Sequence, residues 1–300
     1  TAVRRRGPPR QSPWWALVFV GPTAVGIVAF YLWPTLRTMI MSFTKTGPFG
    51  GSEFVGWENY ATLFRDPELL GALRNTAFFT IITLVGIPLA VAIAALLNTN
   101  GLRGRGACTA RCTSSPVVTM PAAIALVWRM IYNGDFGVLN EVLGVFGIEG
   151  RSWLNDPSTA LVSIAVVGIW AGLGSNIVIF LAGLQGIPDT LLEAADLDGA
   201  GPIRKFFSIT VPLLSPSIFF VSVISVIGTL QVFDLVYMML GRSNPAMPNT
   251  RTIVYLFYQA GGFLDNQRGY AAAIAVVLLV IILVLTAFQF RLQKKWVHYE

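Results

Sequence analysis

The sequence predicts an all-α membrane protein with six transmembrane helices and with both termini in the cytoplasm. Hydrophobic residues make up 54% of the 300 residues, whereas charged residues make up only 12%. Soluble globular proteins carry about 25% charged residues, so water cannot be the only solvent of this chain. Long apolar runs recur along the sequence, and Lys and Arg gather in alternate loops between them. Together these observations favour a polytopic helical membrane fold.

Six apolar runs account for the predicted spans, because a membrane-spanning helix needs about 20 apolar residues. They cover residues 14–33, 76–97, 116–132, 160–184, 213–240 and 270–290. The run at 76–97 contains no charged residue and is the clearest, whereas the run at 116–132 is the weakest. Proline removes a helical hydrogen bond. Kinks or helix ends are therefore expected at Pro34, Pro88, Pro121 and Pro216.

Basic residues set the predicted orientation. Lys and Arg occur in the N-terminal tail 1–12, between the second and third spans, between the fourth and fifth spans, and in the C-terminal tail 291–300. The positive-inside rule places all four segments in the cytoplasm. The loop 133–159 on the other side carries several acidic residues and only one basic residue, Arg151. Residues 13–290 therefore form the predicted membrane domain, with outer loops at 44–70, 133–159 and 241–267.

A polar segment lies between the fourth and fifth spans and reads EAADLDGAGPIRKFFSITVP from 193 to 212. A helix start is predicted at Asp189, since an acid in the first turn suits the helix dipole. Asp198-Gly199 is typical of a helix end, and Gly201-Pro202 permits a second start. The segment is therefore predicted to form two short cytoplasmic helices bent about Gly199. From the residues alone, it is either a solvated connector or a docking element for a soluble partner.

The same segment resembles the EAA loop of binding-protein-dependent ABC importer permeases. Glu193-Ala194-Ala195, then Asp198-Gly199-Ala200, then Ile209 and Pro212 follow that family's pattern, although Val211 stands where Leu is usual. FVGWENYATLF at 54–64, LAGLQGIPDTLLEAADLDGA at 181–200 and QVFDLVYMM at 231–239 extend the similarity. They point to the carbohydrate-uptake branch, of the maltose and glycerol-phosphate type.

The resemblance implies that the loop 185–212 is a coupling helix seated on a cytoplasmic ATPase. The residues implied for coupling are Glu193, Ala194, Ala195, Asp198, Gly199, Ala200, Phe206 and Pro212. The implied partners are a second, different permease subunit, two ABC ATPase subunits that hold ATP and Mg²⁺, an extracytoplasmic binding protein and a carbohydrate-type solute. The implied compartment is the plasma membrane of a prokaryote, where lipid surrounds the spans.

This chain itself is expected to be neither an ATPase nor another enzyme, and to hold no cofactor. It contains no G-x-x-x-x-G-K-[ST] phosphate loop. Its single histidine, His298, and its two cysteines, Cys108 and Cys112, predict no catalytic or metal-binding cluster. The basic residues are too dispersed for a nucleic-acid groove. The alternative function is an ion-coupled secondary transporter, which predicts charged residues buried in several spans.

Polar residues inside spans are expensive and are candidates for the solute pathway. Asn176 lies in the fourth predicted span, and Gln231, Asp234 and Tyr237 lie in the fifth. In a continuous helix Gln231 and Asp234 share one face, since they are three residues apart. Gln231 is the first choice for a solute contact, and Tyr255 is a weaker one. Hydrogen bonding between helices is the alternative role for each polar residue.

Residues 107–115 are small and polar, where related permeases enter the third span with an apolar run. One set of codons for this stretch yields an apolar run in another reading frame. A local frame slip, in the gene or in the recorded sequence, is therefore one hypothesis, and resequencing the coding DNA tests it.

Overall fold

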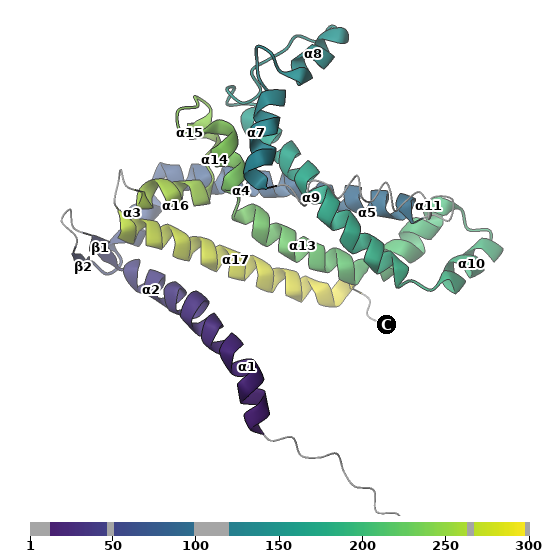
Figure 1. The fold of residues 1–300 in the computed structure, drawn as a ribbon, viewed down its shortest axis with the longest axis horizontal. Helices are drawn as coiled ribbons and strands as arrows, with labels where there is room; N and C mark the ends of the chain where they lie inside the picture. The colour runs from purple at the N-terminus through teal and green to yellow at the C-terminus, as the bar shows by residue number, and fades with distance from the viewer. Residues whose placement is uncertain (1–12, 47–50, 99–119, 263–266, 298–300) are drawn as a thin grey trace, which may run out of the picture.

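The computed structural model describes residues 13–46, 51–98, 120–262 and 267–297. These residues form a mostly helical body in which several long helices lie along one another, while the first helical segment extends away from it (Figure 1). Strands β1 (Thr44–Thr46) and β2 (Ser52–Phe54) form a small antiparallel hairpin, with Thr44 opposite Phe54.

The first apolar segment consists of α1 (Pro13–Ile27), the π turn η1 (Val28–Leu32) and α2 (Trp33–Met41). At the end of η1, the N–H of Trp33 donates to the carbonyl of Val28, five residues earlier. Pro34 follows at once and has no N–H to donate, so the wider turn accommodates it without ending the helix. The predicted end at residue 33 is therefore wrong, and the helical segment continues to Met41.

The second span consists of α4 (Pro67–Leu84) and α5 (Gly86–Leu97), and α3 (Glu58–Arg65) precedes it. The Asp66 carboxylate caps α4 by accepting a hydrogen bond from the N–H of Glu68 at 2.8 Å. The helix breaks at Val85, three residues before Pro88, as expected for a proline kink. The candidate span Pro67–Leu97 begins earlier than the predicted residue 76.

The third predicted span, 116–132, begins outside the described residues. Its described part is α7 (Pro121–Ile131), which has 11 residues and begins at Pro121 as expected. An 11-residue helix is too short to cross a bilayer alone. α8 (Val138–Val145) follows in the loop 133–159. α9 (Ala160–Gln185) then matches the predicted fourth span almost residue for residue.

The fifth segment is broken twice, so the prediction of one helix over 213–240 is wrong. α10 (Asp189–Leu197), α11 (Pro202–Lys205), the π turn η2 (Phe206–Thr210) and α12 (Val211–Leu213) precede α13 (Ser215–Leu230). The axis bends by 67° between Leu213 and Ser215, next to Pro216. A second break at Gln231–Phe233 separates α13 from α14 (Asp234–Leu240).

α15 (Met247–Thr250) and α16 (Ile253–Gly261) are short, and α17 (Arg268–Trp296) extends beyond the predicted end at residue 290. Among the described residues, four helices are long and apolar enough to cross a membrane, and a fifth is added if the bent pair counts as one span. The described residues thus form a helical membrane protein with four to five candidate spans. The predicted total of six is not reached, because the described part of the third segment is short.

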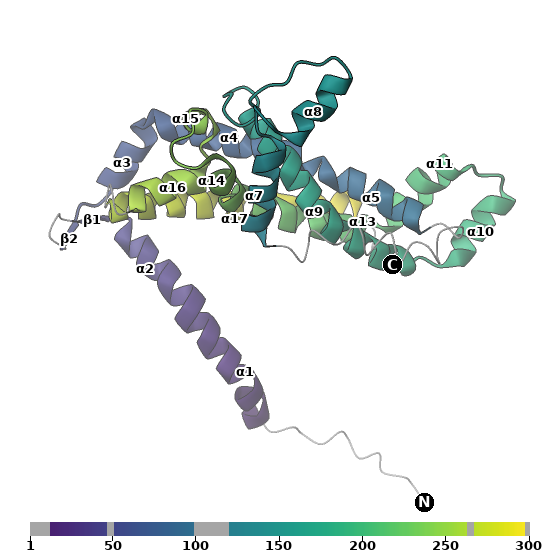
Figure 2. The same ribbon diagram turned by 45° about the horizontal axis from the view of Figure 1, so that its top comes forward.

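The helical body has two distinct ends. α10, α11 and the last turns of α17 lie at one end, whereas α3, the β1–β2 hairpin and α16 lie at the other (Figures 1 and 2). We call them the inner and outer ends, because the positive-inside rule predicts the cytoplasm for residues 193–212. Towards the inner end, α5, α9 and α13 share an apolar core that includes Ile177, Phe180 and Leu214, which we call the inner core.

Candidate functional site

The inner loop, residues 185–212, turns at Gly199 through a Schellman motif. The N–H of Ala200 donates to the carbonyl of Ala195 at 2.9 Å, and the N–H of Gly199 donates to the carbonyl of Asp196 at 3.0 Å. Gly199 has a φ of +73°, a left-handed conformation that glycine adopts without steric cost. α10 therefore ends where the sequence predicts, and α11 restarts at Pro202.

The tip of the inner loop presents apolar side chains to its surroundings. Leu197 is 91% exposed, Ile203 is 75% exposed and Phe207 is 66% exposed. Lys205 forms an ion pair with Asp196, which links α11 to α10. Contiguous exposed apolar side chains mark interaction surfaces. A solvated connector does not need three exposed large apolar side chains in one short loop, so these residues favour docking of a partner.

The base of the inner loop is attached to the inner core. Phe206 packs against this core, close to where α9 and α13 meet. A Cβ atom added at Gly183 of α9 would lie 2.7 Å from Leu214 Cδ1 and 2.6 Å from Ser217 Oγ. This approach is closer than ordinary side chains allow, so α9 and α13 are in tight contact. A displacement of the loop is therefore expected to move α9 and α13 together.

Within the inner loop, six of the residues predicted for coupling cluster at the end of α10, from Glu193 to Ala200. Glu193, Ala194 and Asp198 are exposed, whereas Ala195 is buried beneath the turn. Phe206 and Pro212 lie on the second arm and are half-buried. The predicted set therefore divides into an exposed tip and a partly buried base, and its role in coupling stays a prediction.

Gln231 lines a groove of about 490 Å³ between α2, α16 and α17. Pro34, Thr35 and Thr38 from α2 form one wall, and Phe257 from α16 contributes to another. Gln231 is exposed and caps the broken end of α13. We call this space the Gln231 groove, and it keeps Gln231 as the first choice for a solute contact.

The break after α13 overturns the argument that placed Gln231 and Asp234 on one helix face. Gln231 follows the last residue of α13, whereas Asp234 is the first residue of α14, so no continuous helix joins them. Asp234 is exposed and does not line the Gln231 groove. Tyr237 stacks on Phe233, with ring centroids 5.2 Å apart, and Asn176 is half-buried on α9. The four predicted pathway residues therefore do not form a single site.

Three polar side chains that the sequence argument missed hold the irregular backbone between α14 and α16. The Asn75 amide donates to the carbonyl of Arg251 at 3.0 Å, and the Thr76 hydroxyl accepts from the N–H of Ile253 at 3.0 Å. The Thr252 hydroxyl donates to the carbonyl of Val232 at 3.0 Å. Non-helical backbone within a membrane protein needs such partners. The available signal was this polar pair, Asn75-Thr76, in the middle of α4 next to the long apolar run.

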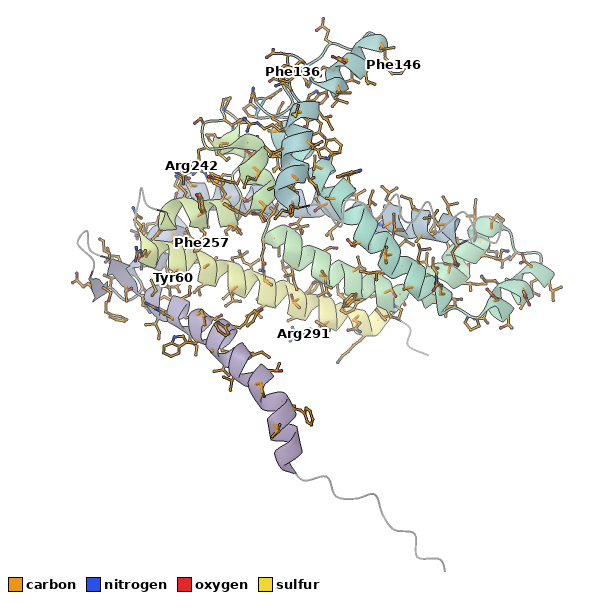
Figure 3. The ribbon with its side chains drawn as sticks, in the orientation of Figure 1. Tyr60, Phe136, Phe146, Arg242, Phe257 and Arg291 are labelled. Atoms are coloured by element: carbon orange, nitrogen blue, oxygen red, sulfur yellow. The ribbon has the colours of Figure 1, made fainter. Side chains whose placement is uncertain are left out.

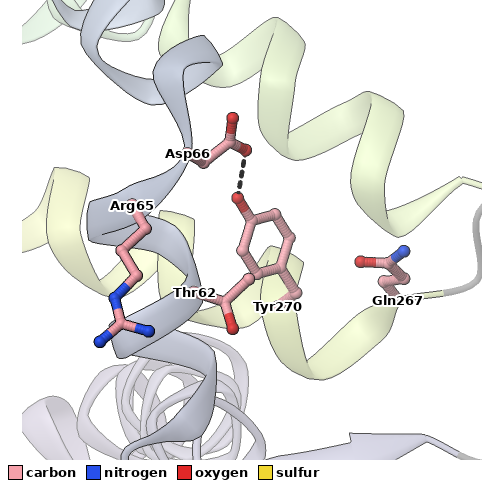
Figure 4. A pocket seen from close by; sticks show the side chains of 5 residues that line it. All are labelled: Thr62, Arg65, Asp66, Gln267 and Tyr270. Atoms are coloured by element: carbon pink, nitrogen blue, oxygen red, sulfur yellow. Dashed lines mark hydrogen bonds between the residues drawn. The ribbon is translucent and has the colours of Figure 1, made fainter.

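A second polar contact at the outer end joins α17 to the corner between α3 and α4. The Tyr270 hydroxyl donates to the Asp66 carboxylate at 2.6 Å, beside an open cavity that Thr62, Arg65 and Gln267 also line (Figure 4). Asp66 thus caps α4 with one oxygen and accepts from Tyr270 with the other. We read this contact as structural, because both oxygens already have partners.

The outer arm, residues 133–159, projects from the body and carries exposed Phe136 and Phe146 (Figure 3). Asn140 organises it. Its amide nitrogen donates to the carbonyls of Gly134 and Arg151 at 3.1 Å each, and its oxygen accepts from the indole N–H of Trp153 at 2.8 Å. The Asn140 side chain thus links the segment that precedes α8 to the segment that follows it.

Replacing Asn140 with alanine is expected to loosen the outer arm. The change removes several hydrogen bonds, each with a net value of about 1 kcal/mol. Amide exchange over residues 134–151 should therefore accelerate by roughly tenfold or more, as measured by hydrogen–deuterium exchange mass spectrometry. Glu141→Ala, at the exposed neighbouring position, is the control. Equal exchange in both variants would show that Asn140 does not organise the arm.

Among the described residues, no group of three or more His, Cys, Asp and Glu side chains could hold a metal ion. Cys108, Cys112 and the stretch 107–115 lie outside the described residues, so the frame-slip hypothesis stays a prediction.

A family model described as the binding-protein-dependent transport system inner membrane component matches residues 69–298. This match covers well over half of the chain. The chain belongs to this family. The permease is thus a multi-pass component of the bacterial inner membrane and not a catalytic subunit. The resemblance of the EAA segment is confirmed, and the ion-coupled alternative is set aside.

Curated relatives extend over almost the whole permease. It is 34% identical to the arabinooligosaccharides transport system permease protein AraP of Bacillus subtilis, over 92% of this chain and 87% of the relative. It is 35% identical to the sulfoquinovosyl glycerol transport system permease protein SmoG of Agrobacterium fabrum, over 92% and 89%. It is 32% identical to the sn-glycerol-3-phosphate transport system permease protein UgpA of Escherichia coli, over 97% of both chains.

The fold is also that of a solved transporter chain. A bacterial alginate ABC transporter, in complex with a periplasmic protein that holds an alginate pentasaccharide, contains a chain that matches with a TM-score of 0.83. The match covers 94% of each chain at 20% sequence identity. At this identity the likeness shows the fold alone.

Proposed function

We propose that this permease forms part of the solute path of an ATP-driven importer for carbohydrates or polyol phosphates, and that its inner loop couples the path to a cytoplasmic ATPase. The relatives named above belong to transport systems for arabinooligosaccharides, sulfoquinovosyl glycerol and sn-glycerol-3-phosphate, which are carbohydrate or polyol derivatives. The observation that carries the coupling role is the inner loop itself. It combines an exposed apolar tip with a base attached to the inner core.

Three kinds of protein partner belong to this proposal. Two ATPase subunits would bind ATP and Mg²⁺, and the inner loop of this permease would dock on one of them. A second, different permease subunit would complete the path. The segment Val18–Met41 supports this, because it is apolar and contributes nothing to the core of its own chain. An extracytoplasmic binding protein would deliver the solute to the outer end, and the outer arm would offer it exposed apolar side chains.

Charging the tip of the inner loop tests the docking role. In the double variant Leu197→Asp, Ile203→Asp, the ATPase subunit is expected to stop co-purifying with the permease. Two carboxylates would then have to be desolvated in an apolar interface. Because both side chains are exposed, the variant should still insert and fold.

The matched control is Val138→Asp, Val145→Asp, which changes two exposed apolar residues in the outer arm, away from the inner loop (Figure 1). It should leave co-purification intact. Stoichiometric ATPase with the inner-loop variant, or an equal loss with the outer-arm variant, would contradict docking at this surface.

A further inference from the structure

A cleft at the outer end, which we call the outer cleft, lies between the loop after α14 and helices α15 and α16. It has a volume of about 340 Å³, near the lower limit of about 300 Å³ for small-molecule sites. Arg242, Asn244, Arg251, Tyr255, Tyr258 and Gln259 are among the residues that line it. None of these residues belongs to the coupling set, and only Tyr255 entered the sequence argument.

One wall of the outer cleft is aromatic. Tyr255 and Tyr258 line it, and Phe233 and Tyr237 support Tyr258 from behind, with ring centroids 5.0 Å and 5.3 Å from its ring. Four rings from α16 and the segment before and within α14 therefore form one rigid cluster. Because Tyr255 is buried and Arg242 lies over the ring of Tyr258, the wall offers a sugar polar groups, namely the hydroxyl of Tyr258 and the amide of Gln259.

The outer cleft also carries positive charge. The guanidinium of Arg242 lies over the ring of Tyr258, 5.3 Å from its centroid, and its side chain is exposed at the outer end (Figure 3). A hydrogen bond with Tyr237 lowers the pKa of the Tyr258 hydroxyl, and the neighbouring Arg242 lowers it further. A guanidinium carries five N–H donors, so Arg242 can hold the Tyr258 hydroxyl and still donate to an anionic oxygen.

Arg251 adds a second guanidinium to the same lining. Its side chain is 13% exposed and forms an ion pair with Glu68, which does not line the outer cleft. Its Nε is buried and has no hydrogen-bond partner among the described residues. Because this atom is buried, a ligand in the cleft does not reach it, and Arg251 contributes positive charge to the lining.

The outer cleft lies one helix away from the Gln231 groove. Tyr255, Tyr258 and Gln259 of α16 line the cleft, whereas Val254 and Phe257 of the same helix line the groove. A solute arriving from the outside would therefore meet the cleft beside the groove that carries the preferred solute contact. This placement puts the cleft ahead of the Gln231 groove for a solute that enters from the outside.

We propose that the outer cleft binds an anionic carbohydrate, such as a sugar that carries a carboxylate or a phosphate, before the solute reaches the Gln231 groove. The sugar hydroxyls form hydrogen bonds with Tyr258 and Gln259, and the anionic group pairs with Arg242, beside the positive charge of Arg251. The inference rests on the proposed import function and narrows its substrate class.

The test measures binding by the whole complex in lipid nanodiscs, without the binding protein, by isothermal titration calorimetry. The probes are glucuronate, glucose 6-phosphate and glucose, which share a ring and differ in charge. The two anions are expected to bind at least tenfold more tightly than glucose. Arg242→Gln should weaken anion binding by roughly tenfold or more and leave glucose unchanged, and Arg242→Lys should restore part of the loss.

The control is Arg65→Gln, which removes the same charge from another exposed position at the outer end. It should leave anion binding intact. Equal affinity for all three probes, or an equal effect of the two substitutions, overturns the proposal. So does an Arg242→Gln effect confined to the affinity for the binding protein.

ATP hydrolysis with the binding protein separates this inference from the proposed function. If no solute stimulates hydrolysis by the wild-type complex, the import function fails, whatever binds in the cleft. If neutral sugars stimulate hydrolysis and no anion binds the cleft, the inference alone fails.

Discussion

Replacing Gly199 with valine is expected to remove most of the solute-stimulated ATP hydrolysis by the assembled transporter. The position has a φ of +73°, which is a true outlier for a β-branched residue. A left-handed conformation costs an ordinary L-residue about 1–2 kcal/mol, which corresponds to a factor of about 5–30 in a conformational equilibrium. The Schellman turn would therefore open, and the angle between α10 and α11 would change.

Asparagine at position 199 is the matched control, because it is several-fold enriched in left-handed conformations. Gly199→Asn should keep most of the stimulated hydrolysis, since the space around this position is open and accepts a side chain. The measurement is hydrolysis by the reconstituted complex, with assembly checked by the subunit ratio. If valine and asparagine behave alike in a fully assembled complex, the turn geometry is not what couples the two proteins.

The largest effect on stability is expected at Gly269, in the first turn of α17. A Cβ atom added there would overlap the carbonyl oxygen of Thr44 and lie 3.1 Å from the amide nitrogen of Asn59. Asn59 donates to the carbonyls of Ser42 and Thr44 at 2.8 Å and 2.9 Å. Gly269→Ala would therefore push β1 away from α17 and disturb both hydrogen bonds.

We expect Gly269→Ala to cost about 3 kcal/mol, at the upper end of the usual range for overpacking, because backbone atoms cannot move aside as a side chain can. Thermal unfolding of the purified permease measures the loss. Gly71→Ala in α4 is the control, since nothing lies within 4 Å of the new methyl group. There alanine should be neutral or slightly stabilising. A Gly269→Ala protein that unfolds at the wild-type temperature would show that β1 does not rest on α17.

Much of the candidate site could be predicted because its signals are local. Asp198-Gly199 ends α10 through a left-handed glycine, and Gly201-Pro202 starts α11. Both events depend on backbone geometry within a few residues, which proline and glycine control directly. The exposed tip and the attached base of the inner loop were not predictable in the same way, since burial depends on what α9 and α13 bring alongside.

The solute path shows the opposite case. The hydropathy of the run over 213–240 does not indicate that the helix breaks after Leu230. Apolar side chains suit a bilayer whether the helix is straight or broken, and the backbone groups freed by a break need partners from elsewhere in the chain. The break is stabilised from a distance by Thr252, whose hydroxyl donates to the carbonyl of Val232. Asn75 and Thr76 in turn hold the backbone on either side of Thr252. A periodicity argument cannot detect such partners.

The sequence by itself determined the membrane class, the family and the turn of the inner loop, and it predicts the orientation. These properties follow from hydropathy, from the distribution of charge and from local backbone chemistry, each of which acts within a short stretch of chain. Only the tertiary structure decided that Gln231 and Asp234 separate, and that Arg242 and Arg251 meet Tyr258 in one cleft. Those outcomes depend on contacts between segments far apart in the chain, which the order of residues does not display.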